Sequence, residues 1–383
     1  MTVAAIAVVG GGPVGLAAAV LLADSGYDVA LVAPPAPASD QRTSALLAGS
    51  VALLERLGVW PDLAETAAPL KTMRIVDGTR RLLRAPEVTF DAAEIGLPAF
   101  GYNVANTALV AALERALGRR RISRVDGLAE SVTAGPDAAT ITLSNGTSLT
   151  ARLVVAADGR RSQVRDSVAI GIDEWRYDQA ALVCNLRHTL PHDDTSTEFH
   201  TEHGPFTLVP LSGNRSSLVW VDRPEESARR LALADAALAA EIEERSASIL
   251  GAVAVEGKRQ VFPLSGMTAR AFARSRVMLV GEAAHMFPPI GAQGLNLGYR
   301  DVTALGDILA GPFPDPGDDI RLAAYDRARR VDVLTRTAAV DALNRTLLSA
   351  FLPVQALRGF GLFLVDRVPA LRQMAMRQGV AAH

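Results

Sequence analysis

The N-terminal segment constrains the fold of this chain more than any other. An apolar run at residues 5–9 precedes Gly10, Gly12 and Gly15, an Ala- and Leu-rich stretch follows, and a second apolar run occupies residues 28–33. Buried parallel strands consist of such runs, and glycines between a strand and a helix permit a tight turn beside a phosphate. We therefore predict a strand–turn–helix–strand unit whose helix N-terminus binds the pyrophosphate of a dinucleotide.

The same stretch could also be a membrane span, because residues 1–23 contain no charged residue and approach the length of a spanning helix. The three glycines at 10–12 and Pro13 argue against this, since they interrupt the apolar run and no basic segment precedes it. We expect a buried strand and helix here and no spanning helix elsewhere. The expected location is the cytoplasm, with peripheral contact to the inner face of a membrane as an open possibility, in a bacterial source.

Composition excludes several classes of function. The chain has 383 residues, of which 49% are hydrophobic, so we expect two packed units. With 39 basic against 41 acidic residues there is no basic surface for nucleic acid. The single cysteine, Cys184, cannot form an intramolecular disulfide, and neither a metal-ligand spacing nor a Ser/His/Asp arrangement stands out.

A second motif follows the apolar strand at residues 153–157. Three Asp-Gly pairs occur in the chain, and those at Asp77 and Asp126 are ordinary turn sequences. The third begins at Asp158-Gly159 and continues through Ser162 to Arg165. Its position directly after a buried strand indicates a binding turn.

The third motif, residues 281–298, is the richest segment. It begins with Gly281-Glu282 after a short apolar strand, passes His285 and two prolines, and ends in a glycine-rich helix start. A carboxylate at a strand end, a rigid turn and a helix N-terminus could together surround the ribityl chain and ring of a flavin.

Together these motifs resemble the single-component FAD-dependent aromatic hydroxylases typified by para-hydroxybenzoate hydroxylase. Within that class the chain is most similar to the ubiquinone-biosynthesis hydroxylases. This second likeness rests on residues 42–46, the pattern Tyr177-x-Gln179-x-Ala181, the run at 291–298 and the helical region at 344–361.

The resemblance implies a set of FAD-contacting residues. They are Gly10, Gly12, Pro13, Val14, Gly15, Arg42, Asp158, Gly159, Arg165, Gly281, Glu282, Pro289, Gly294, Leu295 and Asn296.

Two positions depart from the class pattern. Ala33 stands where an acidic residue usually binds the ribose, and Glu282 stands where an aspartate usually binds the ribityl hydroxyls. Either another group binds the ribose or the affinity for adenosine is reduced.

The implied fold is α/β, with a discontinuous Rossmann-like FAD-binding domain, a second antiparallel-sheet substrate domain and C-terminal helices. We expect the FAD-binding domain at 1–72, 101–175 and 266–325, the substrate domain at 73–100 and 176–265, and the helical region at 326–383. Local patterns predict a helix at 44–57, a hairpin of 73–76 with 81–84, and a helix at 107–117 capped by Asn106.

The resemblance implies an FAD-dependent monooxygenase that uses O2 and NAD(P)H or another electron donor. The expected reaction is hydroxylation, through a flavin hydroperoxide, of the aromatic ring of a polyprenylated phenol in ubiquinone biosynthesis. Two alternatives stay open. One is an FAD-dependent reductase or dehydrogenase of an isoprenoid substrate, and the other is a non-catalytic flavin-binding subunit of a hydroxylase complex.

No catalytic base is evident in the sequence. Weak pocket candidates are Tyr177, Gln179, His285 and Pro289. Four further histidines, more typical of surface or satisfied core residues, are His188, His192, His200 and His203.

A polyprenylated substrate would require access from a membrane. Apolar residues near the C-terminus could form a docking face or could simply pack on the core or in a dimer interface. They are Phe351, Leu352, Phe360, Leu362, Phe363 and Leu364, with Arg358 and Arg367 beside them.

Overall fold

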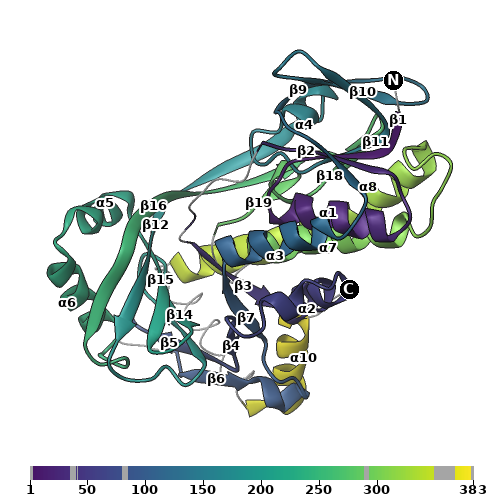
Figure 1. Ribbon diagram of the computed structural model, residues 1–383. Helices are drawn as coiled ribbons and strands as arrows, with labels where there is room; N and C mark the ends of the chain where they lie inside the picture. The colour runs from purple at the N-terminus through teal and green to yellow at the C-terminus, as the bar shows by residue number, and fades with distance from the viewer. Residues whose placement is uncertain are drawn as a thin grey trace.

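The computed structural model describes residues 3–34, 40, 42–79, 85–288, 293–348 and 367–380. It is a mixed α/β structure with two large sheets, as expected (Figure 1). The predicted roles of Pro289, of residues 81–84 and of the apolar residues from Phe351 to Leu364 lie outside the described residues.

The first sheet contains the predicted N-terminal unit. Its strands are β1 (Val3–Val9), β2 (Val29–Val32), β8 (Ile122–Val125), β9 (Ala129–Ala134), β10 (Ala139–Leu143), β11 (Ser148–Ala156), β17 (Ala273–Arg274) and β18 (Val277–Leu279). Their order is β17-β18-β11-β1-β2-β8, with β10 pairing both β11 and β9. The central pairs β18/β11, β11/β1, β1/β2 and β2/β8 are parallel, so the strand ends after β1, β11 and β18 come to one edge.

Helices α1 (Pro13–Asp24), α3 (Asn106–Gly118) and α7 (Gln293–Ile308) lie together along this sheet (Figure 1). Every residue of α1 from Gly15 to Leu22 is buried, because the helix contacts β1, α3 and α7. A helix that is apolar on all sides requires such cover. The uncharged N-terminal stretch is thus a core strand and helix, and no helix in the described part of the chain is both long and apolar enough to cross a membrane.

The second sheet is mixed rather than purely antiparallel. Its strands are β5 (Thr72–Asp77), β6 (Val88–Asp91), β12 (Ile172–His188), β13 (Thr195–His200), β14 (Pro205–Leu211), β15 (Arg215–Asp222), β16 (Val253–Ala269) and β19 (His285–Met286), in the order β19-β16-β12-β15-β14-β13-β5-β6. All neighbours are antiparallel except β13 and β5. The exception arises because β5 comes from a distant part of the chain and joins the sheet edge beside β13.

Two features of the second sheet matter for a site. Strands β12 and β16, each of 17 residues, pair along most of their length and connect the two sheets in space (Figure 1). Helices α5 (Pro224–Ala232) and α6 (Asp235–Arg245) cover one face over a core that includes Leu182, Leu218 and Trp220. Along the chain, strands of the second sheet occur between strands of the first. A discontinuous first domain requires this order.

A third, small sheet corrects one local prediction. It consists of β3 (Thr43–Leu47), β4 (Ala68–Leu70) and β7 (Gly101–Ala105), in the order β3-β7-β4. The predicted helix at 44–57 is therefore a strand followed by α2 (Ala48–Arg56). Pairing with β7 across the whole of β3 outweighs the helical periodicity of its few residues.

The predicted cap of α3 is also wrong. The N-cap position is Ala105, and Asn106 is already inside the helix. The Asn106 side chain instead donates to Asp40 and accepts from Ser44. These bonds connect α3 to β3 and to the loop before it, and no side chain caps the helix.

Short helices and turns connect the sheets, and further helices follow α7. They are the short helix α4 (Gln163–Ser167), the single turns at Trp60–Asp62, Ala92–Ile95 and Gly281–Ala283, and the C-terminal helices α8 (Asp319–Leu348) and α10 (Pro369–Val380). Strand β5 pairs with β6, so the strand partner after the Asp77-Gly78 turn lies at Val88–Asp91.

Candidate cofactor-binding site

The first turn shows why glycine occupies two of its positions. Gly10 has a φ of +125°, and a Cβ there would lie 2.1 Å from the carbonyl oxygen of Ala157. A Cβ on Gly15 would lie 2.0 Å from the carbonyl oxygen of Gly10. These two glycines therefore permit β1, β11 and α1 to pack. Gly12 differs, because a Cβ there would meet nothing within 4 Å and the residue is exposed.

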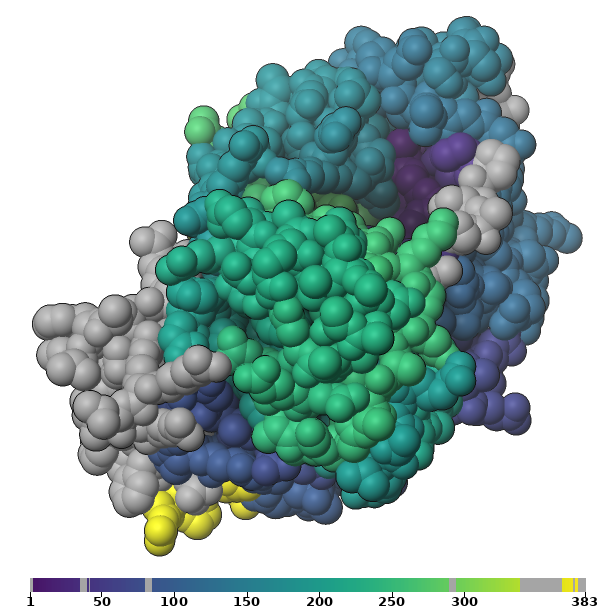
Figure 2. Space-filling view, turned by 90° about the vertical axis from the view of Figure 1, so that its left-hand side faces the viewer, coloured from purple at the N-terminus to yellow at the C-terminus, as the bar shows by residue number. Residues whose placement is uncertain are grey.

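The N-terminus of α1 begins at this turn. Gly12 is its N-cap, no side chain caps it, and Pro13 occupies the first helical position. Amide groups of the first helical turn have no intrahelical acceptor and carry partial positive charge. This helix start can accordingly bind an anion, and in Figure 2 the surface is hollowed where the purple N-terminal residues lie between teal and green segments.

The Asp158 turn lies beside the first turn, since Gly10 packs on Ala157. Asp158 accepts from the Ser162 hydroxyl at 2.6 Å and from the Val164 amide at 3.2 Å. Burial raises the pKa of the Asp158 carboxyl, and these bonds only partly offset the effect. Ser162 also caps α4 by accepting from the Arg165 amide. Asp158 thus stabilises its own turn.

Arg165 connects this turn to the third motif. Its side chain is only 3% exposed, and Nη1 donates to the carbonyl oxygens of Arg160 at 3.1 Å and Ala283 at 3.2 Å. The guanidinium is therefore surrounded by protein groups. Through the bond to Ala283, Arg165 connects the Asp158 turn to the third motif.

The third motif forms a turn beside α1. Gly281 has a φ of +60°, and a Cβ there would lie 3.3 Å from Val14. The Gly281 amide donates to Asp301 at 2.7 Å. Glu282, next in the chain, is exposed, whereas Ala283 is buried. The Glu282 carboxylate is consequently accessible to a ligand.

The three residues predicted to contact FAD at the start of α7 have different surroundings. Gly294 is exposed, and a Cβ there would meet nothing within 4 Å. Leu295 packs partly buried against the main core. The Asn296 side chain accepts from the Leu47 amide and the Ser50 hydroxyl and donates to the Ala45 carbonyl. Asn296 therefore fixes α7 to the β3–α2 connection.

Arg42 lies near this group. It forms two hydrogen bonds to the Asp40 carboxylate, and its side chain is 54% exposed. Burial alone would raise the pKa of Asp40, but bonds from Arg42 and Asn106 lower it to about 2. The pKa of Arg42 is raised chiefly by Asp40, and Glu282 contributes at longer range. Arg42 and Glu282 therefore bring opposite charges to the same region.

Ala33, the position that lacks an acidic residue, is fully buried and adjoins the first turn. A Cβ on Gly11 would lie 2.8 Å from the Ala33 Cβ. The residue after β2 thus reaches the turn, but its side chain is a methyl group without a hydrogen-bond acceptor.

The weak pocket candidates that the structure describes each have a polar partner within the protein. The Tyr177 hydroxyl accepts from the Trp175 indole at 2.7 Å, and Gln179 donates to the His203 carbonyl at 2.7 Å. His285 is 1% exposed and lies against Asp301. His285 is therefore far less accessible than its place in the motif indicates.

Sequence reasoning gave no role to Asp301, Arg329 or Asp332. Asp301 and Arg329 are almost fully buried and share an ion pair, and Arg329 also pairs with Asp332. The signal for Asp301 was present, since a charged residue occurs on a helix face that is otherwise buried. Nothing local identified Arg329, because its partner lies 28 residues earlier.

The residues present fit a dinucleotide with a flavin. A glycine turn with an uncapped helix start at α1, an accessible carboxylate at Glu282 and an exposed Gly294 in the first turn of α7 are all present. Solved structures have the same fold. Para-nitrophenol 4-monooxygenase from Pseudomonas putida matches with a TM-score of 0.80 and 21% identity over 98% of this chain and 97% of that one. Klebsiella pneumoniae HpxO, complexed with FAD and uric acid, matches with a TM-score of 0.77 and 18% identity over 97% and 96%.

Similarity in sequence gives the family. A family model described as "FAD binding domain" matches residues 3–339. The ubiquinone hydroxylase UbiL of Rhodospirillum rubrum is 36% identical over 99% of this chain and 90% of its own length. The 3-demethoxyubiquinol 3-hydroxylase of Escherichia coli is 34% identical over 97% of both chains. The chain therefore belongs to this FAD-binding family of flavin-dependent monooxygenases, and its cofactor is FAD.

Proposed function

We propose that this chain hydroxylates the aromatic ring of a polyprenylated phenol in ubiquinone biosynthesis, using O2 and electrons from NAD(P)H or another donor. The observation that carries the proposal is the nearly full-length similarity to two ubiquinone-pathway hydroxylases. The cofactor turns described above supply the second line of support.

We propose contacts for each half of the cofactor. The backbone N–H groups of Gly12, Val14 and Gly15 at the start of α1 surround the pyrophosphate, and Pro13, which has no N–H, lies against it at the first helical position. Arg42 contacts a phosphate or ribose. Asp158 and Gly159 line the same edge through backbone groups, because the Asp158 carboxylate is engaged by Ser162 and Val164. Glu282 contacts the ribityl hydroxyls, and the exposed backbone at Gly294 meets the flavin ring.

Bound FAD supplies electron transfer and the activation of O2. The chain contributes an electrostatic environment, because the positive end of the α7 dipole at Gly294 stabilises negative charge on a neighbouring ring. Tight packing of Val14 against Gly281 and Gly298 limits the access of water from the α1 side.

For the substrate we propose the face of the second sheet opposite α5 and α6. Side chains alternate along β12 and β15, so Ala181 and Val221 point away from the core under these helices. With Leu264 they form a separate apolar cluster, against which Tyr177 packs. Ala181, Val221 and Leu264 are almost fully buried, so we propose that they support the wall of the substrate site from behind. Tyr177 is half-buried and would present the accessible part of that wall to a prenylated ring.

The test is turnover of a synthetic polyprenylphenol by the purified protein with FAD, NADH or NADPH, and 18O2. We expect substrate-stimulated O2 uptake and a product that carries one 18O atom. Reduction of the substrate without 18O would favour the isoprenoid reductase. FAD binding without turnover for any donor would favour a non-catalytic subunit.

We also propose peripheral contact with a membrane, since a polyprenyl tail partitions into bilayers. Val331 and Leu334 on α8 are 66% and 49% exposed and could contribute to such contact. Co-sedimentation with vesicles of phosphatidylethanolamine and phosphatidylglycerol tests this, and a Val331→Ser/Leu334→Ser variant should sediment less. Absence of sedimentation for the wild-type protein would contradict it.

A further inference from the structure

Asp301 is a buried charge at the junction of three segments. It lies on α7 and is 0% exposed. One oxygen accepts from the Gly281 amide and from His285 Nε2, each at 2.7 Å, and the other accepts from Arg329 Nε at 2.7 Å. A buried carboxylate is tolerated only when it is paired and hydrogen-bonded in this way. Burial by itself raises the pKa of Asp301, but His285 and Arg329 outweigh burial and lower it.

The two bonds to the turn lie on either side of Glu282. Gly281 precedes it and His285 follows it by three residues, so Asp301 fixes both ends of a short turn whose exposed member is Glu282. Because a carboxylate oxygen only accepts, His285 Nε2 must donate. The orientation of the Glu282 backbone therefore depends on Asp301.

The turn has little room to move on its other side. A Cβ on Gly281 would lie 3.3 Å from Val14, and a Cβ on Gly298 would lie 2.6 Å from Val14 and 3.4 Å from the Gly281 Cα. The start of α1, the turn and α7 are thus in contact at small residues. Packing from the α1 side and hydrogen bonds from the α7 side together give the turn one position.

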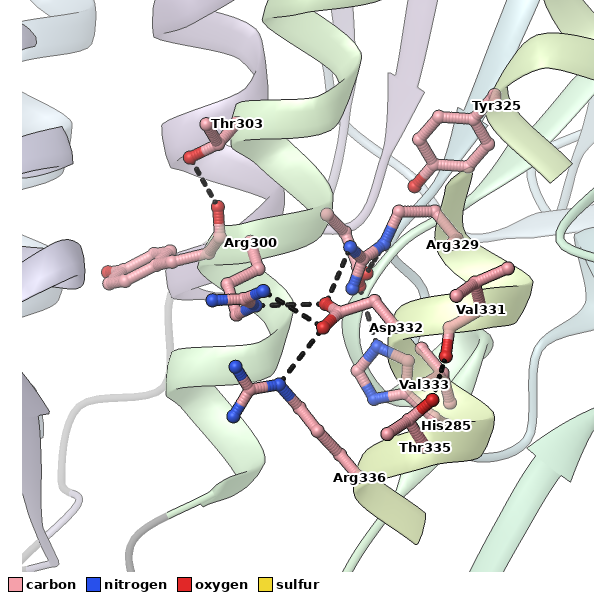
Figure 3. Close-up of polar contacts among 12 residues, drawn as sticks. His285, Arg300, Thr303, Tyr325, Arg329, Val331, Asp332, Val333, Thr335 and Arg336 are labelled. Carbon is pink, nitrogen blue, oxygen red and sulfur yellow. Dashed lines mark hydrogen bonds and ion pairs between the residues drawn. The ribbon is translucent and has the colours of Figure 1, made fainter. Parts of the chain in front are cut away.

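Arg329 on α8 connects Asp301 to further charged residues on α7 and α8. Its Nη1 donates to Asp332, which also accepts from Arg300 on α7 and Arg336 on α8 (Figure 3). Asp332 does not contact the turn. The cluster therefore has a half that contacts the turn, at Asp301, and a half that only joins α7 to α8, at Asp332.

The His285 side chain has almost no exposed surface. It is 1% exposed, and its Nδ1 is buried without a hydrogen-bond partner in the described part of the chain. A reacting molecule would have to displace protein atoms to reach the ring. The role left to His285 is to connect the turn to Asp301.

We propose that Asp301 is a positioning residue for FAD: through the Gly281 amide and His285 it holds Glu282 toward the flavin half of the cofactor, with Arg329 as its counter-charge. This inference rests on FAD binding and is independent of which ring the enzyme hydroxylates. It separates the flavin half of the site, controlled by Asp301, from the pyrophosphate half, controlled by the start of α1.

The test compares Asp301→Asn with Asp332→Asn by calorimetric titration of the full-length apoprotein with FAD and with ADP. Both variants lose one carboxylate from the same cluster, and ADP occupies only the half of the site at α1. We expect Asp301→Asn to weaken FAD binding about tenfold or more, with ADP binding changed less than about threefold. Asp332→Asn should change both affinities less than about threefold.

If Asp301→Asn weakened the binding of FAD and ADP equally, or if both variants weakened FAD binding equally, Asp301 would have only a general structural role. Either result would overturn the proposal. If Asp301→Asn does not fold, His285→Ala removes one of the two bonds to the turn. That variant should weaken FAD binding about threefold and leave ADP binding unchanged, and an unchanged FAD affinity would overturn the proposal. A wild-type chain that binds ADP but not FAD would instead overturn the cofactor assignment.

Discussion

The first sheet brings backbone turns to one edge, whereas the second sheet presents two faces of side chains. At the first sheet, glycine is required at positions 10 and 15 because a Cβ at either position would lie within 2.2 Å of a backbone oxygen. At the second sheet, the tightly placed glycines meet side chains instead, since a Cβ on Gly266 would lie 2.2 Å from the Trp175 ring and one on Gly204 would lie 2.5 Å from Val221, whereas the turn residue Gly213 stands in open space. Backbone geometry therefore specifies the cofactor half. The substrate half is specified by the side chains that each strand places on the two faces of the sheet.

This difference predicts the largest effect for Gly15→Ala. The added Cβ would overlap the Gly10 carbonyl oxygen, so we expect a loss of about 3 kcal/mol or more in the free energy of unfolding. Urea denaturation measures it. The matched control is Gly213→Ala, whose φ of +72° costs about 1–2 kcal/mol. Equal losses would show that the two regions do not differ as described.

The same contrast explains what could be read from the sequence. The glycine turn was predictable because the whole strand–glycine–helix pattern lies in one short stretch of sequence, although the carbonyl that excludes a side chain at Gly10 belongs to the distant Ala157. Strand β3 was not, since its partner β7 lies more than fifty residues later and local periodicity favours a helix. The Asp301–Arg329 pair was not predictable either, because it joins two helices whose packing is set by the whole core. For the substrate side, Tyr177 and Gln179 are named by pattern alone.

The second prediction concerns the core of the second sheet. Leu218 is fully buried under α5 and α6, so Leu218→Ala should lower the free energy of unfolding by about 3 kcal/mol. FAD affinity at 10 °C, where the variant stays folded, should be unchanged. A large loss of FAD affinity would show that the two halves are coupled through this core.

The third prediction uses acid. Burial raises the pKa of Asp332, but Arg300 and Arg329 outweigh it and hold the pKa well below the usual range. A carboxyl group whose pKa is lower in the folded than in the unfolded chain stabilises the fold. This stabilisation is fully present above the unfolded pKa of about 3.9 and is lost as the pH falls through the folded pKa. Asp332→Asn should therefore cost about 2 kcal/mol at pH 7 and less at pH 3. Urea denaturation at both pH values measures this, and a cost that grew at pH 3 would contradict it.

The fourth prediction separates ligand contact from folding within the first turn. Gly12 is exposed with a φ of −76°, so Gly12→Ala should fold with a free energy of unfolding within about 1 kcal/mol of wild type. FAD affinity should fall about tenfold, because the methyl group enters the space where the pyrophosphate approaches. Titration of the apoprotein measures it, and unchanged affinity would place the cofactor elsewhere.

The smallest effect is expected for a surface ion pair of the second sheet. Glu256 pairs with Arg187 and Arg215, which are 70% and 44% exposed. Hydrogen bonds from these arginines lower the pKa of Glu256, yet solvent screens the pairs. Glu256→Gln should change the free energy of unfolding by about 0.5 kcal/mol or less. A loss as large as that of Asp332→Asn would remove the distinction between the buried cluster and the surface.

The most direct test of the cofactor half is the visible absorption spectrum of the purified full-length protein, followed by release and identification of any bound chromophore. The account predicts flavin absorption and one FAD released per chain, or its restoration when FAD is added to colourless protein. A colourless protein that FAD does not reconstitute would contradict the assignment of the glycine turn, Glu282 and the α7 start to FAD.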